Sequence, residues 1–242
     1  MGNAKRSWQL DKRNLQRIPA EVLRDTRADS LRLFENALTE LPDELWTLTA
    51  LRLLNLGDNK ISRLPDAIGN PVGLPDFLYL SHNRLAALPK TLGNLTQLAY
   101  LNLSDNRLIA LHDSIGAMKG LLELRLYHNQ LASLPDSIYA LTHLRELHAQ
   151  HNQLSLLPAN IGALANLREL DLAANQLTAL PQSIGNMAQL RRLNLRNNFI
   201  ITLRPTIGDL QKLTHLDFRG NPLRSLPDSI GDIATLEKLD LR

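Results

Sequence analysis

The sequence predicts an α/β repeat solenoid, with one parallel β-sheet along one face and short helical or 3₁₀ turns along the other. Two observations lead to this fold class. Asparagines recur nine times at steps of 23 residues, with a single step of 24. Each lies in the pattern L-x-x-L-x-L-x-x-N-x-L, and repeats this short bury their leucines only by stacking on one another. The nine positions are Asn36, Asn59, Asn83, Asn106, Asn129, Asn152, Asn175, Asn198 and Asn221.

The strands of the sheet are expected shortly before each asparagine. Leu124 and Leu126 alternate with polar or aromatic residues, which is the period-two pattern of a short strand with one buried face. The pattern recurs in every repeat, and further strands are expected near residues 8–11 and 237–241. The sequence therefore predicts about eleven parallel strands, stacked roughly 4.8 Å apart.

The turns opposite the strands are expected to begin at a proline and to end at a glycine. Pro135 follows a core leucine, and proline suits the first position of a short helix. A glycine follows the next aliphatic residue in seven of the nine repeats, where we expect a positive φ that ends the helix. Trp46 and Tyr139 replace it in the other two. The glycines are Gly69, Gly93, Gly116, Gly162, Gly185, Gly208 and Gly231.

The chain is expected to form a single domain of 242 residues, since a solenoid is one continuous body. Residues 1–27 form an irregular N-terminal capping coil, in which Arg13 replaces the asparagine and Asp25 a core leucine. Residues 28–235 hold the nine asparagine repeats, and 236–242 are an incomplete last repeat. Because no polar coil shields that repeat, we expect either a truncated piece of a longer protein or self-association through the uncapped C-terminal end.

The 24-residue step marks a local irregularity. Residues 69–78 contain one extra residue and two prolines, with Pro71 at the position of a leucine in the next repeat. Insertions in repeat proteins usually fall in loops, so we favour an outer loop insertion over a bend between the first three coils and the rest.

Composition excludes several function classes. The net charge is +3, with both ends leaning positive and the centre negative, so the basic stripe of a nucleic-acid-binding protein is absent from the sequence. No apolar run is long enough to span a membrane, and the N-terminus lacks the apolar region of a signal peptide. The sequence has no cysteine. We therefore expect a cytoplasmic location, or delivery into a host cytosol if the protein is a bacterial effector.

The full consensus, L-P-x-x-I-G-x-L-x-x-L-x-x-L-x-L-x-x-N-x-L, covers nearly the whole chain. It resembles the intracellular 23-residue class of leucine-rich repeat proteins, which includes plant intracellular Ras-group-related proteins, animal Ras-signalling and polarity scaffolds, and bacterial proteins. The resemblance implies a horseshoe with a concave parallel sheet, buried asparagine amides that bond backbone groups, and a protein or peptide ligand on the concave face. An alternative is the targeting domain of a larger bacterial effector or signalling enzyme whose catalytic part is absent here. Some such effectors use a catalytic cysteine, which this sequence lacks.

Solvent-facing strand positions should stack into columns on the concave face. Phe77, Tyr79, Tyr100 and Tyr127 fall in adjacent coils there, and clustered exposed aromatics are typical of interfaces, although scattered ones need no explanation. An acidic strip, Glu123, Glu146, Glu169 and Asp171, is followed by arginines, and these charges either compensate one another or select the partner. The predicted protein-binding residues are Phe77, Tyr79, Tyr100, Tyr127, Arg125, His148, Glu146, Glu169, Arg192 and Arg196.

A column of Asp58, His82, Asp105, His128 and His151 suggests a metal site, because both residue types are ligands. Side chains in one column lie in a line, however, whereas zinc prefers a tetrahedron, so we expect no metal and no cofactor. His128, His148 and His151 are only weak candidates for a partial site. We expect Asp–His pairing across strands instead, which would make binding pH-sensitive between about pH 5 and 8.

Enzymatic activity is not expected. The sequence contains no glycine-rich phosphate loop, no G-x-S-x-G, no H-E-x-x-H and no kinase signature. Glu123 and His148 could form an acid–base pair, but an open sheet face offers no dry pocket for it. The sequence therefore predicts a non-enzymatic recognition module or scaffold.

Overall fold

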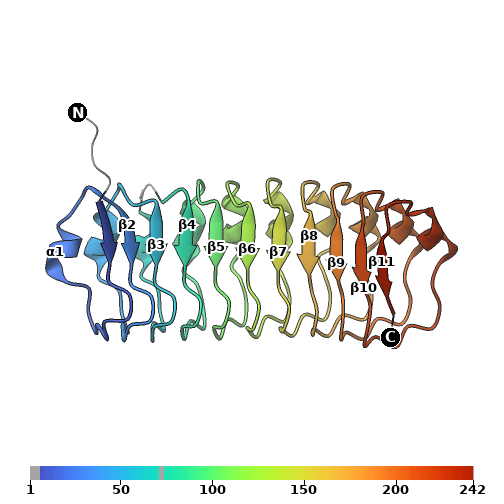
Figure 1. The fold of residues 1–242 in the computed structure, drawn as a ribbon, viewed down its shortest axis with the longest axis horizontal. Coiled ribbons are helices and arrows are strands. Elements are labelled where there is room, and N and C mark those ends of the chain that lie inside the picture. Colours follow the sequence, from blue (N-terminus) through green and yellow to red (C-terminus); the bar gives the residue numbers. More distant parts are fainter. Residues whose placement is uncertain (1–5, 71–73, 242) are drawn as a thin grey trace.

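The computed structural model describes residues 6–70 and 74–241, which form the expected solenoid (Figure 1). Eleven strands make one parallel sheet in which spatial order follows chain order. Most strands have only three residues. The strands are β1 (Arg6–Gln9), β2 (Ala28–Arg32), β3 (Leu53–Asn55), β4 (Phe77–Tyr79), β5 (Tyr100–Asn102), β6 (Glu123–Arg125), β7 (Glu146–His148), β8 (Glu169–Asp171), β9 (Arg192–Asn194), β10 (His215–Asp217) and β11 (Lys238–Asp240).

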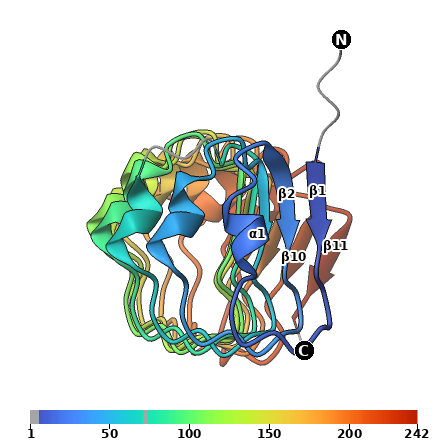
Figure 2. The same cartoon turned by 90° about the vertical axis from the view of Figure 1, so that its left-hand side faces the viewer.

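Short turns of helix line the face opposite the sheet, and the end view in Figure 2 shows the two layers joined by loops. One is a single α-helical turn near the N-terminus and the rest are 3₁₀ helices, which confirms the predicted fold class. They are α1 (Ala20–Leu23), η1 (Asp43–Thr47), η2 (Asp66–Gly69), η3 (Lys90–Asn94), η4 (Asp113–Ala117), η5 (Asp136–Ala140), η6 (Ile161–Ala163), η7 (Gln182–Asn186), η8 (Pro205–Asp209) and η9 (Asp228–Asp232).

The first strand begins earlier than the pattern predicts. We expected it near residues 8–11, but β1 spans Arg6–Gln9. The chain turns away from the sheet soon afterwards, because Lys12 takes a left-handed conformation with φ of 59°. The Asp11 carboxylate contributes to this turn by accepting a hydrogen bond from the Phe34 amide at 2.8 Å.

Buried asparagines hold each coil to its neighbours, as predicted. The side-chain amide of Asn129 donates to the carbonyls of Leu126 in its own coil and of Leu103 in the preceding one, at 2.9 and 3.0 Å. Its carbonyl oxygen accepts the Leu108 amide at 3.0 Å. Asn129 is only 8% exposed, so these bonds satisfy backbone groups that water does not reach. The same contacts recur at the other repeat asparagines, from Asn36 to Asn221. Asn36 accepts one additional bond and Asn221 forms one bond fewer.

The prediction for the proline was wrong in detail. Pro135 precedes η5 as an extended N-cap residue, with φ of −67° and ψ of 149°, instead of occupying the first helical position. Pro205 is the exception, since it lies inside the first turn of η8. An extended proline fits the end of the preceding segment, because its fixed φ suits that conformation as well as a helix.

The prediction for the turn glycines was also wrong. Among the described residues, Gly220 is the one glycine with a positive φ, and it lies in another part of the coil. A Cβ added at Gly116 would lie 2.5 Å from the Ser137 carbonyl oxygen in the next coil. At six of the seven turn glycines, all except Gly231, the next coil approaches too closely for a Cβ, and the conformation itself is ordinary.

The exception at Tyr139 supports this explanation. In the next coil the turn that would pack on this position is disturbed: Asn160 has φ of −97° and ψ of 16°, and η6 has three residues where η4 and η5 have five. Tyr139 itself projects outward and is 42% exposed. We infer that the side chain at this position displaces the following turn.

The 24-residue step leaves the sheet undisturbed. Leu53 pairs with Phe77 and Asn55 with Tyr79, in the register found between the other strands. Residues 71–73, which include Pro71 of the expected insertion, lie outside the described residues. The extra residue is therefore accommodated between η2 and β4 and not within the strands.

The N-terminal end of the solenoid is covered by its own coil. Val22 of α1 is fully buried, and the indole of Trp8 donates a hydrogen bond to Asp25 at 3.0 Å. Burial alone would raise the pKa of Asp25, but the bond from Trp8, the Arg27 amide and the Arg6 guanidinium together lower it. Asp25 therefore replaces a core leucine with a charge that has partners of its own.

Candidate binding face

Two columns of side chains run along the exposed face of the sheet, as the sequence predicted. Parallel pairing places Phe77 beside Tyr100 and Tyr79 beside Asn102 without a register shift. We call them the first and the second column. The first is Ser30, Leu53, Phe77, Tyr100, Glu123, Glu146, Glu169, Arg192, His215 and Lys238. The second is Arg32, Asn55, Tyr79, Asn102, Arg125, His148, Asp171, Asn194, Asp217 and Asp240.

Three aromatic rings from β4 and β5 form one cluster. The ring centroids of Tyr79 and Tyr100 are 4.9 Å apart, and Phe77 lies 5.7 Å from Tyr100 and 6.1 Å from Tyr79. These distances fall within the range of favourable aromatic pairs. Phe77 is 38% exposed and the two tyrosines are half-buried. We call Phe77, Tyr79 and Tyr100 the aromatic cluster.

Arg125 of β6 borders the aromatic cluster. Its guanidinium lies 5.6 Å from the centre of the Tyr100 ring and donates a hydrogen bond to Glu123 at 2.5 Å. Burial lowers the pKa of Arg125, but the Glu123 hydrogen bond and the charges of Tyr100, Glu123 and Tyr127 together outweigh burial, so the pKa is raised. The arginine therefore stays charged over the ring, an arrangement that a cation–π contact stabilises.

Burial also raises the pKa of both tyrosines in the aromatic cluster. It raises the pKa of Tyr100 to about 12, although the neighbouring Arg125 favours the phenolate. The pKa of Tyr79 is raised as well, by burial and by the charge of Glu123. Both phenols remain neutral over the whole physiological range and can donate a hydrogen bond to a ligand.

Tyr127 does not belong to this cluster, although the sequence placed it there. Its ring lies edge-on to His128 at 5.5 Å, and His128 in turn lies 4.5 Å from His151. Tyr127 stands two residues beyond Arg125 of the second column and directly before the left-handed turn residue His128, which its ring contacts. It forms a separate group with the two histidines.

The charges on this face are paired mostly along each strand. Glu123 pairs with Arg125 at 2.5 Å, Glu146 with His148 at 3.2 Å and Lys238 with Asp240 at 3.1 Å. Both members of such a pair lie two residues apart on one strand and therefore on one face. Of the three arginines near the acidic strip in the sequence, Arg125, Arg145 and Arg168, only Arg125 takes part in an ion pair among residues 6–70 and 74–241. These three ion pairs correspond to the tripeptides E-L-R, E-L-H and K-L-D in the sequence.

The sign of the charge reverses along the sheet. In the first column Glu146 and Glu169 give way to Arg192 and Lys238, while the second column changes from basic to acidic over the same strands. Glu169 and Arg192 meet at this boundary, 3.8 Å apart. The two ends of the face thus present opposite charge patterns to a ligand.

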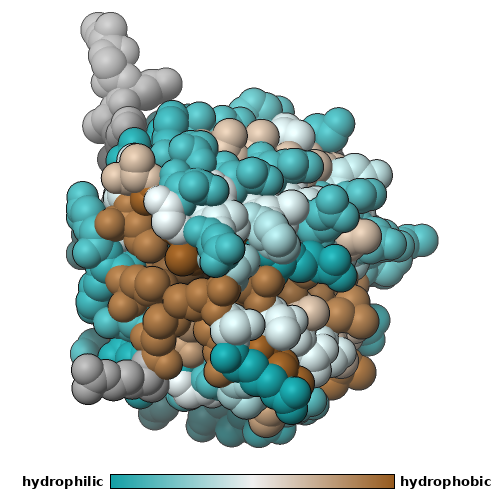
Figure 3. Space-filling model, turned by 90° about the vertical axis from the view of Figure 1, so that its right-hand side faces the viewer, coloured by the Kyte–Doolittle hydropathy of each residue, from teal (hydrophilic) through white to brown (hydrophobic). Residues whose placement is uncertain are grey.

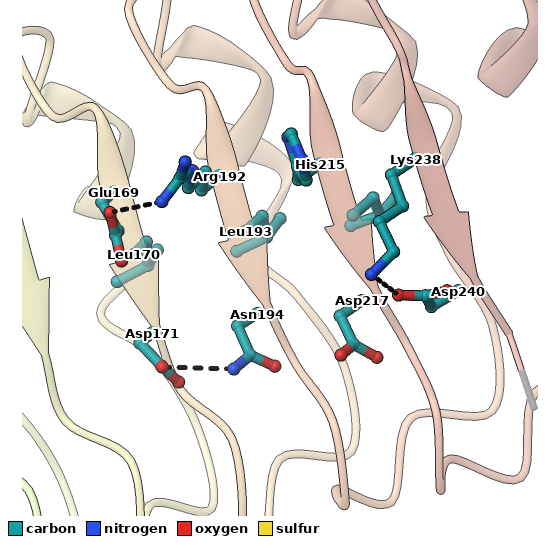
Figure 4. Close-up of a pocket in the computed structure, with 11 residues that line it drawn as sticks. Glu169, Leu170, Asp171, Arg192, Leu193, Asn194, His215, Asp217, Lys238 and Asp240 are labelled. Atoms are coloured by element: carbon teal, nitrogen blue, oxygen red, sulfur yellow. Dashed lines mark hydrogen bonds and ion pairs between the residues drawn. The ribbon is translucent and has the colours of Figure 1, made fainter.

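A shallow hollow lies over β8 to β11 (Figure 4). Of the residues that line it, only Glu169 and Arg192 belong to the predicted protein-binding residues. Asp171 there accepts a bond from the side chain of Asn194 at 3.1 Å. Asp217 pairs with Arg219. Burial alone would raise the pKa of Asp217, but the hydrogen bonds from the Arg219 side chain and backbone, together with the charges of Arg219 and Arg196, lower it. The polar lining is Glu169, Asp171, Arg192, Asn194, His215, Asp217, Lys238 and Asp240.

Several side chains of the second column accept hydrogen bonds from backbone amides two residues further along the chain. Asn102 accepts the Ser104 amide at 3.0 Å, and Asp171 accepts the Ala173 amide at the same distance. Asn194 accepts the Arg196 backbone amide at 3.2 Å, and Arg196 itself is exposed. These carboxylates and amides stabilise the bend after each strand, so they are partly committed before any ligand arrives.

The histidine column is a row of turn residues and not of strand residues, which corrects the sequence analysis. His82, Asp105, His128 and His151 have φ between 52° and 56°. The Asp105 carboxylate lies between two imidazoles, 2.8 Å from His128 and 3.5 Å from His82, so the predicted Asp–His pairing is present. Each residue directly precedes a buried asparagine, where the chain turns left-handed.

Of the three weak metal candidates, His128 and His151 lie side by side, but His148 does not join them. His148 lies with Glu123 and Glu146, where one ligand atom from each falls within 4.8 Å of the others, and not with His128 and His151. Glu123 is already bonded to Arg125 and Glu146 to His148. The group is explained by these ion pairs, and we assign no metal to it.

Comparison with known families agrees with the fold. Models described as leucine-rich repeat region or leucine-rich repeat match residues 81–182, 189–242 and 50–71. Together with the repeating coil and its buried asparagines, these matches place the chain among the leucine-rich repeat proteins. Leucine-rich repeat domains are usually non-catalytic. No curated protein sequence matches the chain at the significance required.

Solved structures resemble it over nearly its whole length. A leucine-rich repeat protein of Leptospira interrogans is 31% identical with a TM-score of 0.89, over 94% of this chain and 58% of that one. The ectodomain of the Arabidopsis thaliana receptor kinase GASSHO1/SCHENGEN3, in complex with CASPARIAN STRIP INTEGRITY FACTOR 2, is 32% identical with a TM-score of 0.84, over 97% and 29%. The plant peptide hormone receptor RGFR1, in complex with RGF2, is 27% identical with a TM-score of 0.71, over 93% and 41%. The chain thus spans only part of these structures.

Within the described parts of the chain, no helix is both long enough and apolar enough to cross a membrane.

Proposed function

We propose that this protein is a non-enzymatic recognition module that binds a peptide, or an extended segment of a protein, across its exposed sheet. The aromatic cluster carries the proposal, because three mutually packed rings remain partly open to solvent on a face whose other side chains are mostly polar. Preorganised aromatic side chains lose little conformational entropy on binding and are typical of the centre of an interface.

The charge pattern supports one orientation of the ligand. Two of the more exposed charged side chains are Glu146, at 42%, and Arg192, at 63%. Strands are roughly 4.8 Å apart and an extended peptide advances roughly 3.3 Å per residue. A ligand with an aromatic or apolar side chain on the cluster would therefore place a basic residue about three positions away on Glu146, and an acidic one about six positions away on Arg192.

Similar proteins offer a precedent. The plant peptide hormone receptor RGFR1 was solved in complex with RGF2, and the GASSHO1/SCHENGEN3 ectodomain in complex with CASPARIAN STRIP INTEGRITY FACTOR 2. These neighbours favour a peptide over a nucleic acid or a membrane as the partner of this chain.

A random linear peptide library displayed on phage provides the test. Peptides selected on the wild-type protein should carry an aromatic or large apolar residue, and they should bind Phe77→Ala and Tyr79→Ala roughly thirtyfold more weakly, as expected when an interface anchor worth about 2 kcal/mol is lost. Isothermal titration calorimetry with the synthetic peptides gives the affinities.

Tyr139→Ala is the matched control, because Tyr139 is exposed on the opposite face in η5. It should leave the affinity unchanged. Selected peptides that bind all three variants as tightly as the wild type, or that are lost only with Tyr139→Ala, would contradict the proposal. Circular dichroism confirms that each variant is folded.

A second candidate is a targeting domain that directs an activity located elsewhere in a longer bacterial effector or signalling enzyme, which acts in the cytoplasm or in a host cytosol. The observation that favours it is the length of the similar proteins: this chain spans 58% of the Leptospira structure. Fusion of the chain to a fluorescent reporter tests this candidate. Localisation to a defined partner that depends on Phe77 and Tyr79 supports it, and uniform distribution opposes it.

A further inference from the structure

The surface between the first and the second column is closed by ion pairs on some strands and open on others. On β6, β7 and β11 an ion pair crosses from one column to the other, and these pairs are Glu123–Arg125, Glu146–His148 and Lys238–Asp240. Within the described chain, no ion pair crosses between the columns on β8, β9 or β10. The shallow hollow, of about 190 Å³, lies over these three strands and extends to β11.

The hollow lies within the sheet, because β8, β9 and β10 each pair with a strand on both sides. Their polar side chains contact one another along the columns and not across them. Glu169 lies 3.8 Å from Arg192 within the first column, and Asp171 accepts the side chain of Asn194 at 3.1 Å within the second (Figure 4). The space between the two columns is therefore left to a ligand.

The two walls of the hollow carry opposite charge. The first column supplies Arg192 and His215, with Lys238 beyond them, and the second column supplies Asp171 and Asp217. Figure 4 shows these side chains as two rows that run across the strands. Residues two apart on a strand are roughly 6.7 Å apart, which is about the distance between the bases of the two walls.

Arg192 and Asp171 are the charges that a ligand can use. The Arg192 side chain is 63% exposed, and its ion pair with Glu169 is long, at 3.8 Å. Asp171 accepts hydrogen bonds from the Ala173 amide and the Asn194 side chain, which are uncharged donors, and it pairs with no cation among the described residues. An anion at Arg192 and a cation at Asp171 would each form a charge-assisted bond that the folded chain does not supply.

The size of the hollow favours an extended peptide segment. Its volume of about 190 Å³ is below the roughly 300 Å³ at which pockets for small molecules begin. Side chains of an extended peptide point alternately to opposite sides. A segment that runs across the strands between the columns therefore directs one residue to the basic wall and the next residue to the acidic wall.

We propose that the hollow binds an extended peptide segment in which acidic and basic side chains alternate, with an acid on Arg192 and a base on Asp171. Adjacent strands are roughly 4.8 Å apart and adjacent peptide residues roughly 3.3 Å, so a lysine or arginine of the ligand covers an offset of only about 1.5 Å. The inference rests on the proposed function for a ligand that runs across the strands. It adds a second contact site, which does not involve the aromatic cluster.

Two peptides of identical composition test the proposal. One alternates lysine and glutamate over six residues, the other places three lysines before three glutamates, and neither contains an aromatic or apolar residue. Each is titrated into the isotope-labelled protein at an ionic strength of about 10 mM, where surface charges are weakly screened, and followed by two-dimensional NMR. The alternating peptide should bind at least roughly tenfold more tightly than the block peptide and shift the amides of β8 to β10, because only alternating charges meet both walls.

Variants of the two walls identify the charges. Arg192→Glu should weaken the alternating peptide by roughly tenfold or more, because it places a like charge opposite the acid of the ligand. Asp171→Asn should weaken it by roughly fivefold, since the amide keeps the bond to the backbone but loses the charge. Arg107→Glu and Asp136→Asn are the matched controls, because they make the same changes at exposed positions outside both columns. They should leave the affinity unchanged.

Preferential binding of the alternating peptide over β8 to β10, weakened by both wall variants and by neither control, supports the proposal. Equal affinity for the two peptides, amide shifts confined to other strands, wall variants that bind normally, or no binding at roughly 1 millimolar peptide would overturn it.

Phe77→Ala separates this inference from the proposed function. It should bind the alternating peptide like the wild type, because the aromatic cluster lies on β4 and β5. If selected aromatic peptides depend on Phe77 and the alternating peptide does not bind, only the inference about the hollow fails. If the alternating peptide binds as described and the aromatic peptides do not depend on Phe77, only the role of the aromatic cluster fails.

Discussion

Asparagine side chains at single positions hold this solenoid together. Asn129 bonds three backbone groups in two coils besides a fourth, weaker contact at 3.4 Å to Tyr127. A leucine in its place would fill space but leave buried amide and carbonyl groups without partners. These residues are structural, and the variable columns beside them carry recognition.

Replacement of Asn129 by alanine should therefore be costly. Each buried backbone group left without a partner costs roughly 1–3 kcal/mol, so we expect Asn129→Ala to lower the free energy of unfolding by roughly 2 kcal/mol or more. Urea unfolding followed by circular dichroism measures the loss. Asn186→Ala is the control, since Asn186 is an exposed asparagine of η7. Equal stability of the two variants would show that the buried bonds are unimportant.

The raised pKa of Tyr100 predicts how its ionisation and its contribution to stability depend on pH. Its pKa is raised to about 12, against about 10 in an unfolded chain, so its contribution to stability is fully present below pH 10 and is lost as the pH rises through 12. The tyrosinate absorbance of the wild type minus that of Tyr100→Phe should show a midpoint near pH 12. A midpoint near 10 would mean that the ring is not buried against its neighbours.

At the scale of one turn, the spacing of adjacent coils determines which residue fits. We expect Gly116→Ala to lower stability by about 1–3 kcal/mol, because the added methyl group would press on the Ser137 carbonyl. Gly231→Ala is the matched control at the same position of the last coil, where the space is open, and it should change stability by less than about 0.5 kcal/mol. Thermal unfolding compares them, and a tolerant Gly116 would refute the packing explanation.

The turns also show where sequence reasoning reaches its limit. The strand pattern and the columns follow from the periodicity of the sequence, and the asparagine bonds follow from the resemblance to leucine-rich repeat proteins. The reason for the turn glycines does not, because it depends on the distance between coils. Left-handed conformations at His82 and Asp105 were missed for the same reason: the pattern of leucines does not say where the strand ends.

The candidate site was predictable in part. Register alone placed Phe77 beside Tyr100, so that pairing followed from the repeat length. Tyr127 was misplaced because a position after the second column points towards the turn, and the direction of a side chain there is set by the bend and not by alternation. The ion pairs along each strand are visible in the sequence as opposite charges two residues apart, but the sequence does not say which of the nearby arginines reaches the acidic strip.

For the whole molecule, the aromatic cluster and the shallow hollow occupy different parts of one continuous sheet. The cluster is on β4 and β5, the hollow lies over β8 to β11, and Figure 1 shows that these strands are well separated along the solenoid. The C-terminal end of the solenoid exposes apolar residues of its last coil (Figure 3). A ligand with two motifs on a linker that spans the cluster and the hollow would bind more tightly than either motif alone.

Photo-crosslinking tests the central claim most directly. A selected peptide that carries a photoreactive residue at its aromatic position is irradiated in complex with the wild-type protein, and the attachment sites are read by mass spectrometry. The account predicts crosslinks on β4, β5 and β6, at the aromatic cluster and Arg125. Crosslinks on the 3₁₀ turns, with none on these strands, would contradict it.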